Sequence, residues 1–364
     1  MGQLRPLMFG FSLGVALLAL SGCDPFSQAD SMMDEYVERV GRVLDRSAEL
    51  QPIPSGDLMP RRRERRLTMP TLDMDMLDFL SLYGCELQYV VGERNSVMGR
   101  VMQPLNRLRY ELRFIQAAQD CLPRIEKKEL RSSIEQAITS KVESLPIAVW
   151  NATWGSEEIE SLLTLSKGPL PTRLSAEPAA QLAGDMRQVN EMLAAVFAGD
   201  HSLSLESIGP IQQRWEAQHL AGQLFISAHL LTTRLGDATL LLQTRLNGRP
   251  LCLDQKPNNR SEQMEGVLYN VYSAEVQPYL AQVRQLRDDL IPPLARMAEL
   301  QAETMPPDFH HWYREHLSLD NPEGLWGRLD AAMKRHTESW QRLLDQCGLT
   351  PGSHEALVSA DFPG

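Results

Sequence analysis

Four cysteines in the body of the chain carry thiols that can oxidise to disulfide bonds, at Cys85, Cys121, Cys252 and Cys347. An even number of cysteines in an oxidising compartment predicts two disulfides, and four thiols allow three pairings. We predict the sequential pairing of Cys85 with Cys121 and of Cys252 with Cys347. A zinc site is not predicted, because the chain has no Cys-x-x-Cys motif and no closely spaced cysteine and histidine.

A geometric objection applies to the first of these pairs. If helices over residues 72–92 and 96–121 form a tight antiparallel hairpin, Cys121 lies ~27 Å beyond the residue that faces Cys85, at 1.5 Å per residue. A disulfide requires Cα atoms within about 7 Å of one another. The pairing therefore requires the second helix to break or turn back, and Pro104 is the residue that can break it.

A dense polar cluster, Glu93-Arg94-Asn95-Ser96, lies between two segments with apolar helical faces. Ser96 can cap the helix that follows it by accepting the first backbone N–H groups. Glu93 and Arg94 can form charge-assisted pairs with groups on another helix. We interpret the cluster first as a turn network that fixes the angle of the hairpin, and a polar ligand pocket is the alternative. No histidine or cysteine nucleophile accompanies it, so a catalytic role is not predicted.

Five arginines stand within six residues of an otherwise acidic chain, at Arg61, Arg62, Arg63, Arg65 and Arg66. Anionic lipid headgroups attract such polybasic segments. One hypothesis is therefore that this run contacts a membrane or docks an acidic partner. The alternative is a solvated linker that is kept open by its own charge.

The densest histidine cluster spans residues 310–316, where His311 and Glu315 can share a helix face. The His-Glu-x-x-His order of a zinc protease is absent from it. Trp150 and Trp154 can line a groove, although tryptophans in helical domains more often fill the core. We therefore predict no metal site, no cofactor and no catalytic residue.

A further cysteine follows an apolar run over residues 6–20, in the sequence Leu20-Ser21-Gly22-Cys23, which resembles the lipobox of a bacterial lipoprotein signal. The run is about 15 residues long, shorter than the ~20 that span a bilayer, and Arg5 supplies the positive charge before it. The resemblance implies cleavage before Cys23 and acyl chains on that residue, which attach the protein to a membrane. Asp24 resembles an inner-membrane retention signal, so we expect the periplasmic face of the inner membrane.

The charge balance argues against one class of partner. The chain has 36 lysines and arginines against 47 aspartates and glutamates, a formal net charge of −11. Nucleic-acid phosphates favour basic proteins, so no nucleic-acid partner is expected. No later stretch approaches the ~18 apolar residues of a transmembrane helix. We expect a soluble body held at the membrane by lipid.

Apolar residues recur at helical spacing almost throughout the chain. The first stripe after the lipobox consists of Met33, Val37, Val40 and Leu44. The clearest stripe predicts one uninterrupted helix over residues 211–247, ~55 Å long. Its members are Leu220, Leu224, Ala228, Leu231, Leu235, Ala238, Leu242 and Leu246.

A second long stripe runs over residues 276–297 and contains Pro278, Pro292 and Pro293. Each proline should kink or interrupt the helix, because proline lacks a backbone donor. A polar turn over residues 256–261 joins the two long stripes, which predicts an antiparallel pair of helices.

We therefore expect an all-α fold, a bundle-like body of long antiparallel helices on a lipidated N-terminal tether. The expected organisation is a cleaved signal over residues 1–22, a lipidated tether with a first helix and a proline- and arginine-rich linker over 23–71, a helical domain over 72–350 with a candidate subdomain boundary near 166–178, and a tail over 351–364. Within the second unit, residues 51–70 should form an exposed connector.

Two short stretches resemble a known family. Gly84-Cys85-Glu86-Leu87 and Glu93-Arg94-Asn95-Ser96 are similar to a family of uncharacterised gammaproteobacterial lipoproteins, domain of unknown function 3080. The resemblance covers most of the chain after the signal and implies a membrane location and a helical body, but no activity. We expect a structural or interaction protein with an envelope protein as its partner. The alternative is a binding module that holds a small molecule, lipid or glycan between helices. No catalytic constellation supports an enzyme.

Overall fold

The computed structural model describes residues 28–71, 84–95 and 101–349, and the part of the chain it describes is built from helices and loops without a β-strand. The helices are α1 (Gln28–Val43), α2 (Arg62–Arg65), α4 (Glu86–Asn95), α5 (Pro104–Cys121), α6 (Lys128–Ala152), α7 (Glu157–Leu162), α8 (Ala176–Phe197), α9 (Ile208–Ala217), α10 (Leu220–Leu246), α11 (Asn259–Val267), α12 (Gln277–Glu299), α13 (Pro307–His316) and α14 (Leu325–Asp345). The short 3₁₀ helices η2 (Leu122–Arg124) and η3 (Leu165–Lys167) and the π-helix η4 (Leu268–Val276) complete them. The all-α prediction is confirmed.

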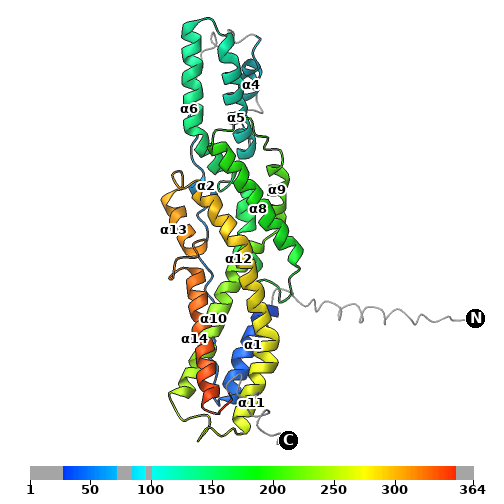
Figure 1. Ribbon diagram of the computed structural model, residues 1–364, viewed down its shortest axis with the longest axis vertical. Coiled ribbons are helices and arrows are strands. Elements are labelled where there is room, and N and C mark those ends of the chain that lie inside the picture. Colours follow the sequence, from blue (N-terminus) through cyan, green and yellow to red (C-terminus); the bar gives the residue numbers. More distant parts are fainter. Residues whose placement is uncertain (1–27, 72–83, 96–100, 350–364) are drawn as a thin grey trace, which may run out of the picture.

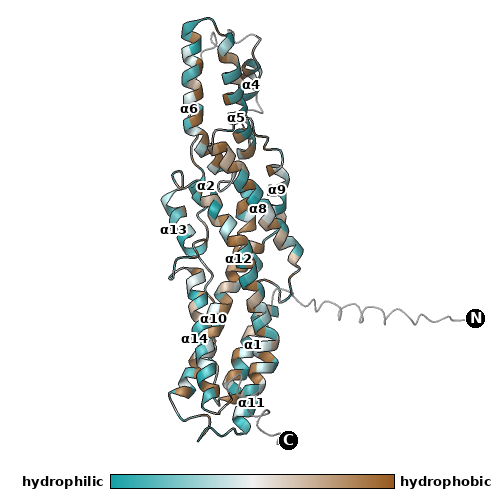
Figure 2. Ribbon diagram, viewed as in Figure 1, coloured by the Kyte–Doolittle hydropathy of each residue, from teal (hydrophilic) through white to brown (hydrophobic). Residues whose placement is uncertain are grey.

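The helices stack into an elongated molecule (Figure 1). Helices α4 and α5 and the first half of α6 project at one end, and α1, α10, α11, α12 and α14 reach the other. Apolar residues lie along one side of most helices (Figure 2). The three predicted stripes on α1, α10 and α12 are buried, apart from the half-buried Leu246. Among the described residues, no helix combines the length and the apolarity needed to cross a membrane.

The first and the last helix share a buried polar contact. The hydroxyl of Tyr36 on α1 is hydrogen-bonded to Nε2 of His336 on α14 at 2.6 Å, and Nε1 of Trp340 donates to the same hydroxyl at 2.8 Å. Tyr36 and His336 have no exposed surface. Helix α1 is therefore an integral part of the main core and not a separate tether.

The predicted single helix over residues 211–247 is divided into α9 and α10. Gln218 between them is extended, with φ −113° and ψ 141°. Ser161 contacts the chain on both sides of this break. Its hydroxyl donates to the carbonyl of Glu216 at 3.0 Å, and its own carbonyl lies 2.9 Å from Nδ1 of His219. The prediction was wrong because the break is imposed by a chain segment that is distant in sequence.

A chain crossing also explains a glycine inside α10. A Cβ atom at Gly222 would lie 1.9 Å from the carbonyl oxygen of Thr164, so no larger residue fits where the segment after α7 passes over the helix.

Helix α12, by contrast, is continuous through two of its three prolines. It runs past Pro292 and Pro293, where the carbonyl of Pro293 accepts a hydrogen bond from Nδ2 of Asn190 at 2.8 Å. Pro278 directly follows the π-helix η4, a local departure from α-helical hydrogen bonding within a helical segment that runs on from α11 to α12. The predicted interruption was therefore wrong at Pro292 and Pro293.

The projecting end has its own small core. Buried residues of α4, α5 and the first half of α6 form a cluster separate from the main one. Cys85 and Cys121 form a disulfide there, with Cα atoms 5.7 Å apart, as the sequential pairing predicted. The geometric objection fails because α5 begins at Pro104, not at residue 96, so proline starts this helix instead of breaking it. Cys252 and Cys347 form the second predicted disulfide.

Residues 51–70, which we name the strap, are largely exposed, as predicted, but they are docked along the body and do not hang free as a linker. Near its start, the N–H of Gln51 donates to Asp237. In its middle, the carbonyl of Asp57 accepts from Nε1 of Trp312 at 3.2 Å. Near its end, Leu67 exchanges two hydrogen bonds of 2.8 Å with the side-chain amide of Asn151. These contacts fix the strap along the main core and bring its arginines to α6.

The candidate boundary near residues 166–178 does not divide the structure. Leu170 is fully buried in the main core, and its N–H donates to Oγ of Ser227 at 2.8 Å. The two clusters instead meet across α5, where Leu108 and Leu112 face the main core and Phe114 faces the small one.

Candidate anion-binding cleft

A cleft of about 230 Å³ opens where the strap meets α4, α5 and α6. Three arginines from three separate segments line it, Arg66 from the strap, Arg94 from the last turn of α4 and Arg107 from the first turn of α5. Met69, Met102 and Asn151 are among the other residues that line the cleft. Converging guanidinium groups are typical of sites that bind carboxylates or phosphates.

Arg65 anchors the strap beside this cleft. Its side chain is fully buried, and Nε donates to the carbonyl of Pro60 at 2.6 Å while Nη2 donates to Glu160 at 2.9 Å. Nη1 donates to the carbonyl of Trp154, and Nε1 of Trp150 donates back to the carbonyl of Arg65 at 2.7 Å. Burial lowers the pKa of Arg65 to about 10 and Glu160 opposes the shift, so the guanidinium keeps its charge at neutral pH.

The five arginines of the basic run therefore have different surroundings. Arg65 is buried and Arg62 is paired with Glu157, so these two candidates of the basic run are engaged within the protein. Arg61 and Arg63 are exposed on the outer side of α2, with 75% of the Arg63 side chain accessible. Arg66 points to the cleft, and its guanidinium has no hydrogen bond or ion pair within the described part of the chain.

Arg66 also borders a second hollow. This hollow has a volume of about 130 Å³, and Gln103, Ser156 and Gln212 are among its lining residues. The stem of Arg66 passes over Gly155, where an added Cβ would lie 3.3 Å from Cγ of the arginine and 2.8 Å from Cα of Asn151. Only glycine leaves this space for the arginine stem.

A buried ion cluster lies beside the cleft. The carboxylate of Glu111 has no exposed surface and is paired with Arg107 and with Nζ of Lys141, the latter at 2.8 Å. Burial lowers the pKa of Lys141, Glu111 opposes the shift, and Arg107 and Arg94 lower it further. Nζ of Lys141 also lies 5.3 Å from the ring centre of Tyr110, and burial raises the pKa of that phenol to about 12. Arg107 and Lys141 thus share one buried carboxylate, and the charge of Arg94 also acts on Lys141.

The polar cluster predicted from sequence is only partly assembled here. Glu93 accepts a hydrogen bond from Arg113 on α5 at 2.9 Å, which confirms a charge-assisted pair across the hairpin. Arg94 lines the cleft and Asn95 ends α4. Ser96 lies outside the described residues, as does Cys23. The capping role predicted for Ser96 stays a prediction, and Gln103 stands at the N-cap position of α5 without a side-chain hydrogen bond to it.

The two tryptophans belong to the core, whereas His311 is exposed and Glu315 is paired with Arg328. Trp150 and Trp154 are fully buried and pack on Phe309, with ring centres 5.0 and 4.8 Å away. His316 is buried and stacked on Trp312. Across residues 28–71, 84–95 and 101–349, no three histidine, cysteine, aspartate or glutamate side chains are placed to hold a metal ion.

Sequence reasoning missed Arg107, Glu111 and Lys141. Two signals in the sequence pointed to them. One is the four-residue spacing of Arg107 and Glu111, which is typical of an ion pair on a helix. Lys141 is the other signal, since it stands on the buried face of α6 between Ala137 and Leu145.

Comparison with known proteins identifies a family without giving a relative of known activity. No curated protein and no solved structure matches the chain. A family described as "Protein of unknown function (DUF3080)" matches residues 33–351, which include nearly all of the described helices. The chain therefore belongs to the DUF3080 family of proteins of unknown function.

Proposed function

We propose that this chain is a lipid-anchored envelope protein that recognises a carboxylate-bearing partner protein through the arginine cleft. Anchoring through acyl chains on Cys23, on the periplasmic side of the inner membrane, is supported by the lipobox sequence Leu20-Ser21-Gly22-Cys23. The observation that carries the proposed recognition is the convergence of Arg66, Arg94 and Arg107 on one cleft.

The size of the cleft favours a partner protein over a free metabolite. Small-molecule sites usually measure ~300–1,000 Å³, and this cleft has about 230 Å³. An aspartate or glutamate side chain fits such a volume. Val101, which is 80% exposed, directly precedes Met102 of the cleft wall. Arginine and methionine are both enriched in protein interfaces.

Substitution of Arg66 tests the cleft, because this arginine has no ion pair in the described chain whose loss would disturb the fold. Arg66→Gln should reduce recovery of a stoichiometric protein partner from detergent-solubilised envelopes about tenfold, since a charge-assisted hydrogen bond contributes ~1.5–3 kcal/mol. Arg63→Gln is the matched control, with the same charge removed from the exposed side of α2. Equal recovery with both variants would contradict the proposal.

The anchor has a separate test. Cells labelled with palmitate should incorporate label into the wild-type chain and not into Cys23→Ala. Labelling of both chains, or of neither, would refute the lipid anchor while leaving the cleft untouched.

A small oxyanion is the second candidate ligand, because Asn151 beside three arginines can donate to phosphate as well as to a carboxylate. Calorimetric titration of the purified chain with inorganic phosphate distinguishes the two. If phosphate bound saturably, Arg66→Gln abolished this binding, and no protein partner were recovered in the pull-down, the alternative function of a small-molecule binding module would be favoured.

A further inference from the structure

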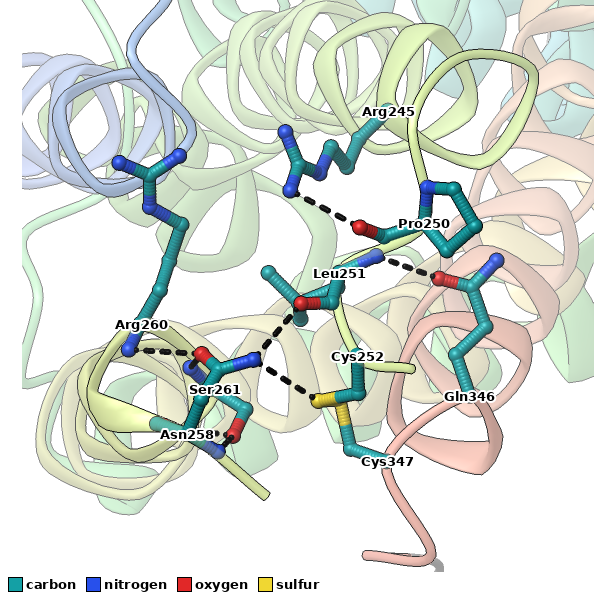
Figure 3. The surroundings of a disulfide bond; sticks show 9 residues. All are labelled: Arg245, Pro250, Leu251, Cys252, Asn258, Arg260, Ser261, Gln346 and Cys347. Atoms are coloured by element: carbon teal, nitrogen blue, oxygen red, sulfur yellow. Dashed lines mark hydrogen bonds between the residues drawn. A yellow bond between two sulfur atoms is a disulfide. The ribbon is translucent and has the colours of Figure 1, made fainter. Parts of the chain in front are cut away.

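A rigid loop closes the end of the molecule opposite the projecting hairpin. It connects α10 to α11, and the disulfide between Cys252 and Cys347 fixes it to the end of α14, with Cα atoms 5.1 Å apart (Figure 3). The N–H of Leu251 donates to Oε1 of Gln346 at 3.0 Å, and Nδ2 of Asn258 donates to the carbonyl of Leu251 at 2.8 Å. The loop is therefore held at both sides.

The backbone of this loop directs one leucine outward. Leu251 and Cys252 are buried, with 4% and 5% exposure, whereas Leu253 is 65% exposed. The next two residues, Asp254 and Gln255, both have positive φ angles, 52° and 55°. Two successive non-glycine residues in the left-handed region are unfavourable and persist only where surrounding contacts fix them. The exposed leucine is thus a fixed feature of the surface.

Basic side chains surround this leucine. Arg245, Arg249, Lys256 and Arg260 line a hollow of about 450 Å³ that also includes Leu253. Among the described residues, those lining the hollow include no carboxylate. Burial lowers the pKa of Arg245 and the neighbouring arginines, Arg260 and Arg249, lower it further, which shows that these cations repel one another. Arg260 is paired with Asp45 at the end of α1.

This concentration of positive charge is unusual for a chain with a net charge of −11. Arg249 and Lys256 are exposed, and neither side chain has a hydrogen bond or ion pair within the described part of the chain. The cluster therefore has unsatisfied capacity for an anion.

We propose that this end of the molecule docks on a membrane surface that contains anionic phospholipids. The four cations contact headgroup phosphates, and Leu253 enters the interface between headgroups and acyl chains. A free phosphate would account for the cations but not for the exposed leucine between them. The loop lies at the extreme end of an elongated body (Figure 1), so a flat surface can reach it. This contact is separate from the acyl chains on Cys23 and from the arginine cleft.

Vesicle sedimentation tests the proposal with a chain of residues 24–364, which contains every described residue and cannot be acylated at Cys23. The chain should sediment with vesicles of phosphatidylcholine mixed with phosphatidylglycerol and not with phosphatidylcholine alone. Arg249→Gln/Lys256→Gln should weaken this binding about thirtyfold, because each basic residue near an anionic surface contributes ~1 kcal/mol. Leu253→Ser should weaken it about tenfold on the same vesicles.

Arg61→Gln/Arg63→Gln is the matched control, since it removes the same charge from two exposed arginines of the strap. Its binding should equal that of the unsubstituted chain. Equal weakening by both double variants would show attraction by net charge alone and overturn the proposal. Unchanged binding of Leu253→Ser, with full displacement of the vesicles by millimolar inorganic phosphate, would also overturn it and assign the hollow to a soluble anion. Far-UV circular dichroism confirms that each variant is folded.

Discussion

Acidification should destabilise this protein, because His229 and His336 are buried in the neutral form. His336 is fully buried, and only its Nε2 has a hydrogen-bond partner among the described atoms, the hydroxyl of Tyr36. Burial lowers the pKa of His336 to about 3. Burial also lowers the pKa of His229 to about 4, and the charges of His316 and Arg328 lower it further. In the unfolded chain both pKa values return to about 6.5.

The unfolded state therefore binds protons as the pH falls below about 6.5, while the folded state does not bind them until the pH approaches the folded values. The free energy of unfolding decreases by about 1.4 kcal/mol for each histidine and each pH unit in this window. From about pH 7.5 to pH 4.5 the two histidines together should lower stability by about 5 kcal/mol. Stability above pH 6.5 is unaffected. Asp30 and Asp237 act in the opposite direction at the acid end, because burial raises their carboxyl pKa values.

Urea unfolding followed by tryptophan fluorescence measures this effect at the two pH values. His336→Gln retains a side chain that can bond to the Tyr36 hydroxyl and does not titrate, so it should lose about half of the pH dependence. His229→Gln should lose a similar part. His310→Gln is the control, since His310 is exposed and should leave the pH dependence as it is. If both core variants kept the full pH dependence of the wild type, the argument from buried neutral histidines would be refuted.

Three further changes have defined expected outcomes. Glu111→Gln leaves two buried cations without a carboxylate and should cost about 3–5 kcal/mol in urea unfolding; a loss below about 1 kcal/mol would mean that water reaches the cluster. Replacing Cys252 and Cys347 with alanine opens a loop of 95 residues and should lower the unfolding free energy by ~4–5 kcal/mol, and an unchanged midpoint would contradict this. Gly222→Ala should reduce the melting temperature sharply, because its Cβ meets a crossing carbonyl, whereas Gly236→Ala, with no atom within 4 Å, should be neutral or stabilising.

Much of the fold follows from local pattern. The apolar stripes of α1, α10 and α12 were predictable because each buries one face against the same core. The sequential disulfides were also predicted, although the register that permits the Cys85–Cys121 bond depends on where α5 begins. A proline at the start of a helix and a proline that breaks one are locally alike, and only the neighbouring chain decides between them.

The candidate site was less accessible to sequence reasoning. Arg65 and Arg63 belong to one basic run, yet one is buried against Trp154 and the other is exposed, and no local signal separates them. Arg66, Arg94 and Arg107 come together only because the strap docks on α6 and the hairpin folds back. Such convergence depends on contacts between distant segments, which a single sequence does not display.

The two hydrogen bonds that join the Tyr36 hydroxyl to His336 and Trp340 have a consequence for biosynthesis. Helix α1 leaves the ribosome about 300 residues before the helix that covers it is complete. Helix α1 also packs against α10 and α11, which are translated before α14, but Tyr36 lacks both of its buried hydrogen-bond partners until translation reaches residues 325–345. A polypeptide that ends earlier lacks α14 and leaves the apolar surface that this helix covers on α10 exposed, which makes it a target for chaperones and proteases.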